Sequence, residues 1–404
     1  MKILALILAG GTGKELSVLT RYRAKTAVPF GGRYRVIDFC LSNCVHSDIQ
    51  EIAILAQYSP KSLIDHIGMG KPWDLDRKSG GVYILQPTHN GEVAKWYLGT
   101  ADALYQNIDL IRNSKADAIL VLSGDQVYVM DYRPMIQYHL AHRTAVTLAM
   151  QRVQASQRSR FGMVRCSRAG LVTAFREKPT ASTFRFASLG IYLFRRDFLL
   201  DVLGSDRADI VFDIIMPRLV EGDVAGYPFD GYWEDIGSIR SYYNASLRLL
   251  RNRSLITDPD WPIFTKGSEL PPARCSESSH VTNSIIGDGC IVKGEVRGSI
   301  LFPGVTVERG AVVEDSIVFS FSRIAGDARV RKAILDKFVV VGNGSSIGMG
   351  ARRGTARGRS DSATDAGSES GGISVLGRGA RIARGAAVPG GMIIEPHARI
   401  GRGR

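Results

Sequence analysis

The chain has 404 residues, of which 45% are hydrophobic and 23% are charged, and its formal net charge is +13. This length allows two domains with full cores, and no apolar run approaches the roughly eighteen residues that span a bilayer, so we expect neither a membrane segment nor a signal peptide. The positive charge suits polyphosphate substrates and anionic effectors as well as nucleic acid. Because no nucleic-acid-binding signature accompanies it, we expect no nucleic-acid partner.

The cysteines are scattered, odd in number and without a C-x-x-C pair. They are Cys40, Cys44, Cys166, Cys275 and Cys290. This usage predicts reduced thiols in a cytoplasmic protein and makes a structural metal improbable.

The chain begins with an apolar run, Ile3–Ala9, that predicts a buried strand and breaks directly into Gly10, Gly11 and Gly13. Backbone without side chains lets N–H groups converge on a phosphate. The spacing fits neither the dinucleotide fingerprint G-x-G-x-x-G nor the P-loop G-x-x-x-x-G-K-[ST]. Taken alone, the turn is as consistent with an ordinary strand-to-helix connection as with a phosphate site.

Up to about residue 250, short aliphatic strands alternate with helical patterns. Strands are predicted at residues 52–55, 118–122 and 172–175, and helices at 62–67, 100–114 and 133–143, with Thr100 as a helix cap. This order is typical of an α/β fold with a doubly wound sheet. Ligands of such sheets bind at the carboxyl ends of strands, where the Gly10–Gly13 and Ser123–Asp125 turns both fall.

After a proline-rich connector, a six-residue period of aliphatic residues begins. Two series keep this interval: Leu301, Val307, Val313 and Phe319, and later Leu376, Ile382, Val388, Ile394 and Ile400. The period predicts a left-handed parallel β-helix with three short strands per coil. Such a prism has flat aliphatic faces and open ends, which neighbouring chains tend to cover.

The patterns predict three regions: an α/β domain over residues 1–255, a linker over 256–280 and a β-helix over 281–404. Residues 351–372 are rich in Arg, Ser and Gly and lack large apolar side chains, which predicts a disordered insertion. Its arginines offer a place for an anionic effector, but a solvated loop is the simpler interpretation.

Two carboxylates occupy positions suited to a metal ion. Asp125 follows a predicted buried strand, where a lone carboxylate is costly unless it binds something, and Asp235 lies in Trp-Glu-Asp-Ile-Gly. Carboxylates from distant segments can converge on Mg²⁺. From spacing alone this pairing is a guess, because any α/β enzyme has aspartates at strand ends.

Several segments together resemble the sugar-phosphate nucleotidylyltransferases. Leu8–Gly11, Arg23–Lys25 and Ala27–Gly32 are similar to the signature of that family. The continuation Tyr34–Phe39, followed by Leu41–Cys44, resembles the glucose-1-phosphate adenylyltransferases in particular. The resemblance covers roughly residues 3–350, which includes both predicted domains.

This resemblance implies transfer of AMP from ATP to glucose 1-phosphate, which gives ADP-glucose and pyrophosphate for glycogen synthesis. It also implies Mg²⁺ held by Asp125 and Asp235, an anionic effector, and a homotetramer or a mixed tetramer with a paralogue. A more distant alternative is an enzyme that uses another nucleotide, such as UTP.

The resemblance also implies roles for individual residues. Lys25 and Asp125 are expected to be catalytic, Lys178 to bind the sugar phosphate and Glu177 to bind the glucose hydroxyls. The other residues expected to bind substrate are Gly10, Gly11, Gly13, Gln57, Tyr97, Gly99, Thr100, Gly162 and Ser188.

The main departure from the family is Glu15, where the family carries an arginine that stabilises the triphosphate. A carboxylate about 4 Å from a phosphate charge costs roughly 4 kcal/mol at an effective dielectric constant near 20. In an active enzyme, either Lys14 takes over the catalytic role of the arginine or Glu15 turns away from the triphosphate. The alternative is a weakly catalytic or non-catalytic regulatory subunit. The intact set Lys25, Asp125, Lys178 and Asp235 favours the active enzyme.

Overall fold

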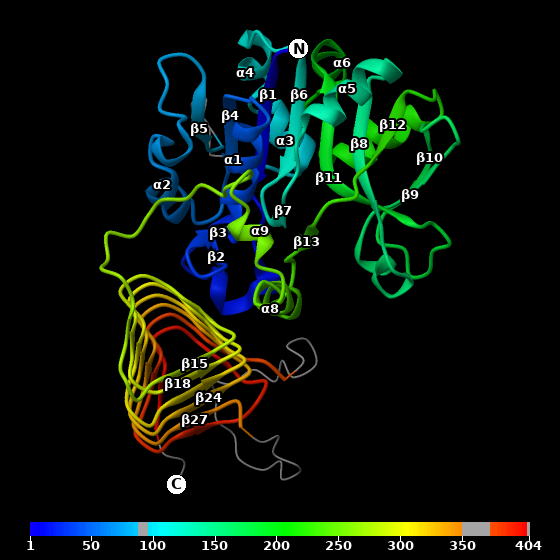
Figure 1. The fold of residues 1–404 in the computed structure, drawn as a ribbon. Helices are drawn as coiled ribbons and strands as arrows, with labels where there is room; N and C mark the ends of the chain where they lie inside the picture. Colours follow the sequence, from blue (N-terminus) through cyan, green and yellow to red (C-terminus); the bar gives the residue numbers. More distant parts are fainter. Residues whose placement is uncertain (88–95, 350–371, 402–404) are drawn as a thin grey trace. The chain divides into compact units, whose positions relative to one another are not determined.

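The computed structural model describes residues 1–87, 96–349 and 372–401, and it divides into two compact units (Figure 1). The first comprises Met1–Gly11 and Phe39–Trp233, and the second comprises Thr12–Asp38 and Glu234–Arg404. The predicted insertion lies outside the described residues except for Gly372. Along the described ranges, no helix combines the length and apolar character that a membrane crossing needs.

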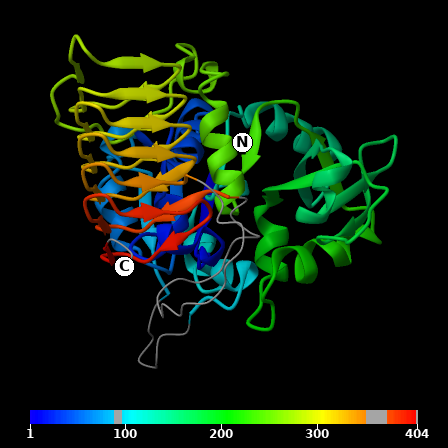
Figure 2. The ribbon, with the colours of Figure 1, turned by 90° about the horizontal axis from the view of Figure 1, so that it is seen from below.

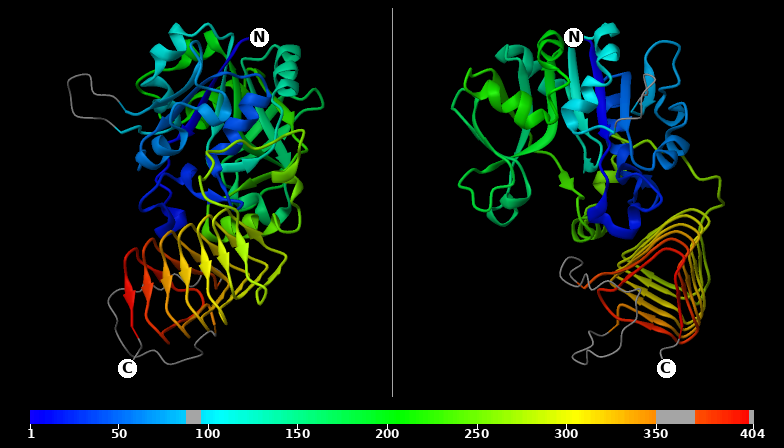
Figure 3. Two further views of the ribbon diagram at one scale, coloured as in Figure 1. Left: turned by 60° about the vertical axis from the view of Figure 1, so that its left-hand side comes forward. Right: turned by 180° about the vertical axis from the view of Figure 1, so that it is seen from behind.

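The first unit is built on a mixed sheet of nine strands with the main order β10-β9-β11-β6-β1-β4-β5, while β8 pairs with β11 and β12. Its strands are β1 (Ile3–Ala9), β4 (Glu51–Ala56), β5 (Gly81–Leu85), β6 (Ala118–Ser123), β8 (Val146–Arg152), β9 (Met163–Cys166), β10 (Val172–Arg176), β11 (Phe186–Arg195) and β12 (Val224–Pro228). The central strand β1 runs parallel to β4 and β6, with Leu6 opposite Ala53 and Val121. Most of its side chains are buried because helices pack along the sheet (Figure 3). The predicted doubly wound α/β fold is confirmed.

The helices of the described ranges are short. The α-helices are α1 (Val36–His46), α2 (Lys61–Ile67), α3 (Thr100–Tyr105), α4 (Ile108–Asn113), α5 (Arg133–His142), α6 (Arg196–Val202), α7 (Met216–Leu219), α8 (Ile239–Arg248) and α9 (Ser254–Thr257). The 3₁₀ helices are η1 (Lys14–Thr20), η2 (Lys25–Ala27), η3 (Lys71–Trp73) and η4 (Ala155–Arg160), and η5 (Ile210–Ile215) is a π-helix.

The prediction of one helix over residues 100–114 is wrong, because the chain breaks between α3 and α4. At the break, Asn107 Nδ2 donates to the Ala103 carbonyl at 2.8 Å, while its backbone N–H bonds to Leu104. A side chain that competes for backbone carbonyls in this way interrupts the helical ladder. The predicted cap is also wrong: Gly99 is the N-cap residue of α3, and Thr100 is its first helical residue.

Most of the second unit is a left-handed parallel β-helix of three sheets, whose strands stack along its axis (Figure 2). The first sheet contains β14 (Arg274–Cys275), β17 (Ile291–Val292), β20 (Thr306–Val307), β23 (Arg323–Ile324), β26 (Val340–Val341), β29 (Arg381–Ile382) and β32 (Arg399–Ile400). The second contains β15 (His280–Thr282), β18 (Glu295–Arg297), β21 (Val312–Glu314), β24 (Arg329–Arg331), β27 (Ser346–Ile347) and β30 (Ala387–Val388). The third contains β16 (Ile285–Ile286), β19 (Ile300–Leu301), β22 (Ile317–Val318), β25 (Ala333–Leu335), β28 (Ser374–Leu376) and β31 (Ile393–Ile394).

The six-residue period corresponds to the inner wall of this prism, except at Phe319, which packs against Tyr242 while its neighbour Val318 joins the core. Val307, Val313 and Val318 each face the interior from a different sheet, and all three side chains are fully buried in one core. The predicted β-helix is therefore confirmed, including its continuation through Leu376–Ile400 after the residues that the structure does not describe.

The third sheet also carries an aliphatic row on its outer face, formed by Ile285, Ile300, Ile317, Ile334, Val375 and Ile393. Most of this row is buried because the segment Thr12–Asp38 and helix α8 of the same unit lie over this side of the β-helix. A β-carbon at Gly32 would lie 2.6 Å from Ile285 Cγ2. Tyr242 on α8 stacks edge-on with Phe319 and donates its hydroxyl to the Pro29 carbonyl at 2.7 Å. This aliphatic face is thus covered from within the chain.

The units follow packing rather than chain order, since residues 12–38 cluster with the β-helix and not with the α/β sheet. The strands β2 (Pro29–Phe30) and β3 (Tyr34–Arg35) form a small hairpin in this segment. Two elements, α1 and β13 (Trp233–Asp235), contain a boundary between the units. The limits 1–255, 256–280 and 281–404 remain a prediction from the sequence.

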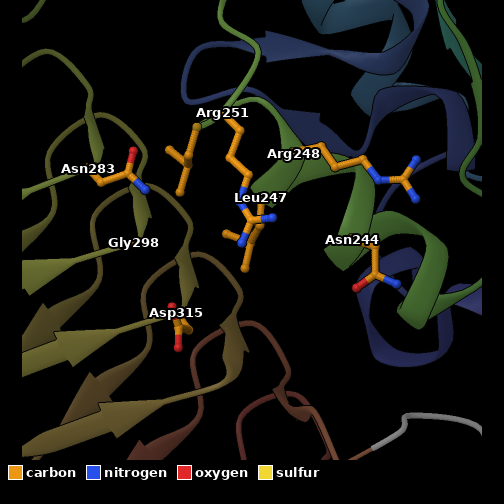
Figure 4. A pocket seen from close by; sticks show the side chains of 8 residues that line it. Asn244, Leu247, Arg248, Arg251, Asn283, Gly298 and Asp315 are labelled. Carbon is orange, nitrogen blue, oxygen red and sulfur yellow. The ribbon is translucent and has the colours of Figure 1, made fainter.

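Helix α8 and one corner of the β-helix border a shallow groove (Figure 4). Its lining residues are Asn244, Leu247, Arg248, Leu250, Arg251, Asn283, Gly298 and Asp315. Next to it, the Tyr243 hydroxyl donates to the Asp315 carbonyl at 2.5 Å. None of the residues predicted for the active site lines this groove.

Candidate active site

The end of β1 is tied to two other predicted site residues of the first unit. Gln57 Nε2 donates to the Gly10 carbonyl at 3.3 Å, and Gln57 Oε1 accepts from the Tyr97 N–H at 2.6 Å. The Tyr97 hydroxyl in turn accepts from Asn107 at 3.1 Å. The Gln57 side chain therefore fixes the start of the glycine turn against the segment that carries Tyr97.

A second cluster joins the predicted sugar-phosphate residues through two main-chain hydrogen bonds. Lys178 N–H donates to the Phe161 carbonyl at 3.2 Å, and Ser188 N–H donates to the Gly162 carbonyl at 2.8 Å. Lys178 Nζ lies 3.8 Å from Glu177 Oε1. Two neighbouring residues, Phe161 and Gly162, thus hold together two separate segments that are predicted to bind substrate.

Gly162 is required here by space rather than by its backbone angles. A β-carbon at this position would lie 2.5 Å from Phe175 Cζ and 2.8 Å from Glu177 Oε2. Both distances are shorter than any van der Waals contact, so a larger residue must displace the ring or the carboxylate. The glycine lets the chain approach Glu177 closely.

Lys178 has a φ of 38°, in the left-handed region that few side chains other than glycine occupy. Backbone strain of this kind is concentrated at functional sites, where the surrounding structure holds it in place. The strained residue presents a largely exposed ammonium group beside the Glu177 carboxylate.

Burial raises the pKa of Glu177, Lys178 opposes this effect, and the charge of Asp209 adds to it. Asp209 caps the π-helix η5 by accepting from the N–H groups of Val211 and Phe212 at 2.8 and 3.0 Å. Its other carboxylate oxygen lies 3.4 Å from Thr100 Oγ1.

Gly99 and Thr100 pack against the segment that leads to Asp209. A β-carbon at Gly99 would lie 2.3 Å from the Ala208 carbonyl, and Thr100 Oγ1 accepts from the Ile210 N–H at 2.9 Å. These two predicted residues therefore adjoin the Glu177 cluster through Asp209.

Asp125 lies just after β6, as predicted, and it is half-buried. Its Oδ1 accepts from Ser123 Oγ at 2.6 Å. The next residue, Gln126, accepts from Trp233 Nε1 at 3.0 Å, and the Trp233 ring meets Phe161 edge-on at 5.2 Å between ring centroids. A continuous set of contacts thus joins the Asp125 turn to the Phe161–Gly162 segment.

Gly11 is exposed at the end of the first segment of the first unit, and the second unit carries the other predicted residues. Gly13 has a φ of 67°, and a β-carbon there would lie 2.8 Å from Thr20 Cγ2 and 3.3 Å from Lys25 Cβ. Thr20 Oγ1 also donates to the Gly13 carbonyl at 2.8 Å. The turn is consequently packed against the start of η2, where Lys25 is half-buried, while Lys14 and Glu15 begin η1 and are exposed.

Asp235 ends β13 and is half-buried, with its carboxylate about 3 Å from the place of a β-carbon at Gly237. Asp125 and Asp235 are both carboxylates, the hard oxygen donors that Mg²⁺ prefers. In the described part of the chain, no group of three or more His, Cys, Asp and Glu side chains is arranged to hold a metal. All five cysteines are free, and burial raises the pKa of the Cys40 thiol to about 12.

Comparison with known proteins decides the family. Residues 4–252 match the family model of nucleotidyl transferases, and residues 271–367 match that of the GlmU-like C-terminal hexapeptide. A protein of Thermomicrobium roseum is 44% identical over 358 residues, which are 86% of this chain and 84% of the relative. Relatives from Bacillus cytotoxicus and Fervidobacterium nodosum are each 42% identical, over 85% and 86% of this chain and 94% and 86% of their own lengths. All three are named glucose-1-phosphate adenylyltransferase.

The chain belongs to the glucose-1-phosphate adenylyltransferase family. Two residues of this family member, Asp209 and Trp233, adjoin the predicted site without having been selected from the sequence, whereas Tyr192 belongs to the strand predicted to complete the glucose site. Ser188 Oγ donates to the Tyr192 hydroxyl at 3.5 Å, and burial raises the pKa of Tyr192 to about 12. Only Asp209 left a usable signal, because an aspartate before an apolar helical run is a typical N-cap.

The close approach at Gly162 generates a prediction for this adenylyltransferase. Gly162→Ala should raise the KM for glucose 1-phosphate about tenfold, since the methyl group displaces Glu177, and should leave the KM for ATP within twofold. Steady-state kinetics with each substrate varied in turn measures both values. The control is Gly267→Ala, where no atom lies within 4 Å of the new methyl group. Equal changes for both substrates would show that Gly162 does not belong to the sugar-phosphate site.

Proposed function

We propose that this chain transfers AMP from ATP to glucose 1-phosphate, giving ADP-glucose and pyrophosphate for glycogen synthesis. The observation that carries the proposal is the cluster in which Phe161 and Gly162 hold Lys178, Glu177 and Ser188 together. The Lys178 ammonium binds the sugar phosphate, and the Glu177 carboxylate accepts hydrogen bonds from glucose hydroxyls. Both interactions recognise one molecule that carries a phosphate next to a polyol.

In the reaction, a phosphate oxygen of glucose 1-phosphate attacks the α-phosphorus of ATP, and the bond to the β,γ-pyrophosphate breaks. The protein's share is to position the two phosphates and to stabilise the charge that develops. We assign Gly10, Gly11 and Gly13 to the triphosphate, with Lys25 and Lys14 as the cations that stabilise it. Gln57, Tyr97, Gly99 and Thr100 border the substrates.

We assign Asp125 and Asp235 to a Mg²⁺ ion. Both side chains supply the oxygen donors that this cation prefers, and neither is deeply buried. When bound, Mg²⁺ neutralises phosphate charge and favours departure of pyrophosphate. Ser123, which donates to Asp125, orients one of the two carboxylates.

Pyrophosphate release tests the proposed function directly. Purified protein with glucose 1-phosphate should release pyrophosphate with ATP and much less with UTP, GTP or dTTP. Asp125→Asn should lose more than nine-tenths of this activity and keep its melting temperature, because the half-buried site loses only one charge. Absence of release with every nucleotide contradicts the proposal, and a preference for UTP makes the chain a nucleotidylyltransferase of another specificity.

The alternative of a regulatory subunit rests on Glu15. Its side chain is exposed at the start of η1, beside the equally exposed Lys14. If the carboxylate repels the triphosphate, Glu15→Arg should raise kcat tenfold or more, since each 1.36 kcal/mol is a factor of ten. If Lys14 has replaced the missing arginine, Glu15→Arg should change little and Lys14→Ala should nearly abolish turnover. No effect from either variant would remove this turn from the ATP site.

We further propose a cytoplasmic homotetramer, or a mixed tetramer with a paralogue. The free state of all five cysteines supports a reducing compartment. Light scattering at micromolar concentration measures the assembly, and a monomer there refutes it.

An anionic effector is proposed for the cations around Lys337 in the second unit. Burial, and then the charges of Arg35, Arg23 and Arg378, lower the pKa of Lys337 to about 8. The folded protein thus binds this proton less tightly than the unfolded chain, so stability should rise between about pH 8 and pH 10.5. An anion bound there restores the charged form.

Lys337→Met should remove that rise in stability. Between pH 7 and pH 10, the melting temperature of the wild type should rise relative to that of the variant. Phosphate at 10 mM should make this relative rise smaller. Exposed Lys293→Met is the control. A difference that is constant with pH contradicts the assignment of Lys337.

A further inference from the structure

One buried ion pair in the second unit joins the segment of residues 12–38 to the β-helix. Arg23 Nη2 lies 2.6 Å from Asp336 Oδ1, and Arg23 Nη1 lies 3.1 Å from Asp336 Oδ2. Their side chains are only 4% and 1% exposed. This bidentate geometry fixes both the orientation and the position of the guanidinium.

The carboxylate of this pair is itself held firmly. Asp336 follows β25, its Oδ1 accepts from the Lys337 N–H at 2.6 Å, and its carbonyl accepts from Ser322 Oγ at 2.9 Å. Both neighbours belong to the β-helix. Asp336 is thus a rigid anchor, and Arg23 is the group that it positions.

Arg23 also helps to hold the turn at Gly13 in place. Its Nη1 also donates to the Leu19 carbonyl in η1 at 2.8 Å. The next residue, Thr20, donates to the Gly13 carbonyl at 2.8 Å, and Lys25 begins η2 two residues after Arg23. The same guanidinium therefore constrains the end of η1 and the approach to η2, which border the Gly13 turn from both sides.

Stability alone is a weak reason for such a pair. A buried ion pair is commonly no more stabilising than apolar side chains of similar volume, because both charges lose their hydration. Apolar side chains cannot supply the directed hydrogen bond to the Leu19 carbonyl, and they cannot fix the position of η1 relative to Asp336.

We propose that Asp336 is a positioning residue for ATP: through Arg23 it holds the Gly13 turn and Lys25 in the geometry that binds the triphosphate. The use of ATP then depends on the β-helix, although Asp336 itself touches no substrate. This inference rests on the proposed function, and in particular on the assignment of Gly13 and Lys25 to ATP.

The proposal predicts an effect on one substrate only. Glu177, Lys178 and Ser188 belong to the first unit and are held there by Phe161 and Gly162. Loss of the Asp336 anchor should therefore weaken ATP binding and leave glucose 1-phosphate binding unchanged. A general loss of stability affects both substrates alike.

The chain offers a matched control in the same two segments. Arg21 Nη2 lies 3.5 Å from Glu395 Oε1, and these side chains are 62% and 46% exposed. This pair also joins residues 12–38 to the β-helix, but at the surface, where an ion pair contributes little. Glu395→Gln should leave both substrates unaffected.

The experiment compares Asp336→Asn, Glu395→Gln and the double variant Arg23→Met/Asp336→Leu. The double variant leaves no unpaired buried charge, so it stays folded even if Asp336→Asn does not. For each we would measure the KM for both substrates, the Kd of a non-hydrolysable ATP analogue, and amide exchange over residues 14–27. Asp336→Asn and the double variant should raise the analogue's Kd at least tenfold, speed exchange over residues 14–27, and change the KM for glucose 1-phosphate less than twofold.

Two outcomes overturn the inference. One is a folded double variant that binds the analogue as tightly as the wild type. The other is an equal rise in both KM values with no local change in amide exchange, which shows a merely structural role. Failure of the proposed function appears differently, as a wild-type protein that releases no pyrophosphate or does not bind the analogue at all.

Discussion

Burial of the outer aliphatic row of the β-helix is the constraint on which the second unit depends. Ile300, Ile317 and Ile334 are fully buried on the side of the third sheet that does not face the β-helix core. Exposing such a row to water costs roughly 25 cal/mol for each Å² of apolar surface. The segment of residues 12–38 and helix α8 remove this cost, and in doing so they bring Gly13 and Lys25 into the packing unit of the β-helix. The segment that we propose binds the nucleotide is therefore shaped by residues more than two hundred positions away.

Much of the fold was predictable because its signals are local and repeat. The six-residue period corresponds, apart from Phe319, to the inner wall of the prism, and the aliphatic runs at residues 3–9, 52–55 and 118–122 correspond to β1, β4 and β6. The grouping of residues 12–38 with the β-helix was not predictable, because pairs such as Arg23–Asp336 connect residues that no local pattern relates. The break at Asn107 was missed for another reason: a single side chain that bonds to the Ala103 carbonyl outweighs the helical pattern around it.

In the candidate site, too, some features were predictable from the sequence and others were not. Motifs located Gln57, Tyr97, Glu177 and Ser188. Within the first unit, hydrogen bonds join Gln57 to Tyr97 and Ser188 to Gly162. No local pattern explains why position 162 must be glycine, since the obstacles are Phe175 and Glu177, thirteen and more residues later. Trp233, which bonds to Gln126 and meets Phe161, was likewise invisible as a connection between the Asp125 turn and the sugar-phosphate cluster. Motifs thus identify the residues expected to bind substrate, whereas only the packing identifies the residues that position them.

Positions 15 and 23 show how differently one short segment tolerates change. Glu15 is exposed on the first turn of η1, where an acidic side chain suits the helix N-terminus, so its replacement of an arginine costs the fold little. Arg23 is buried against Asp336, and loss of either partner leaves a charge without compensation. A change at position 15 can therefore alter the charge at the turn that we assign to the triphosphate while the turn keeps its shape. Activity at this turn therefore depends on which of the exposed side chains of Lys14 and Glu15 governs its charge.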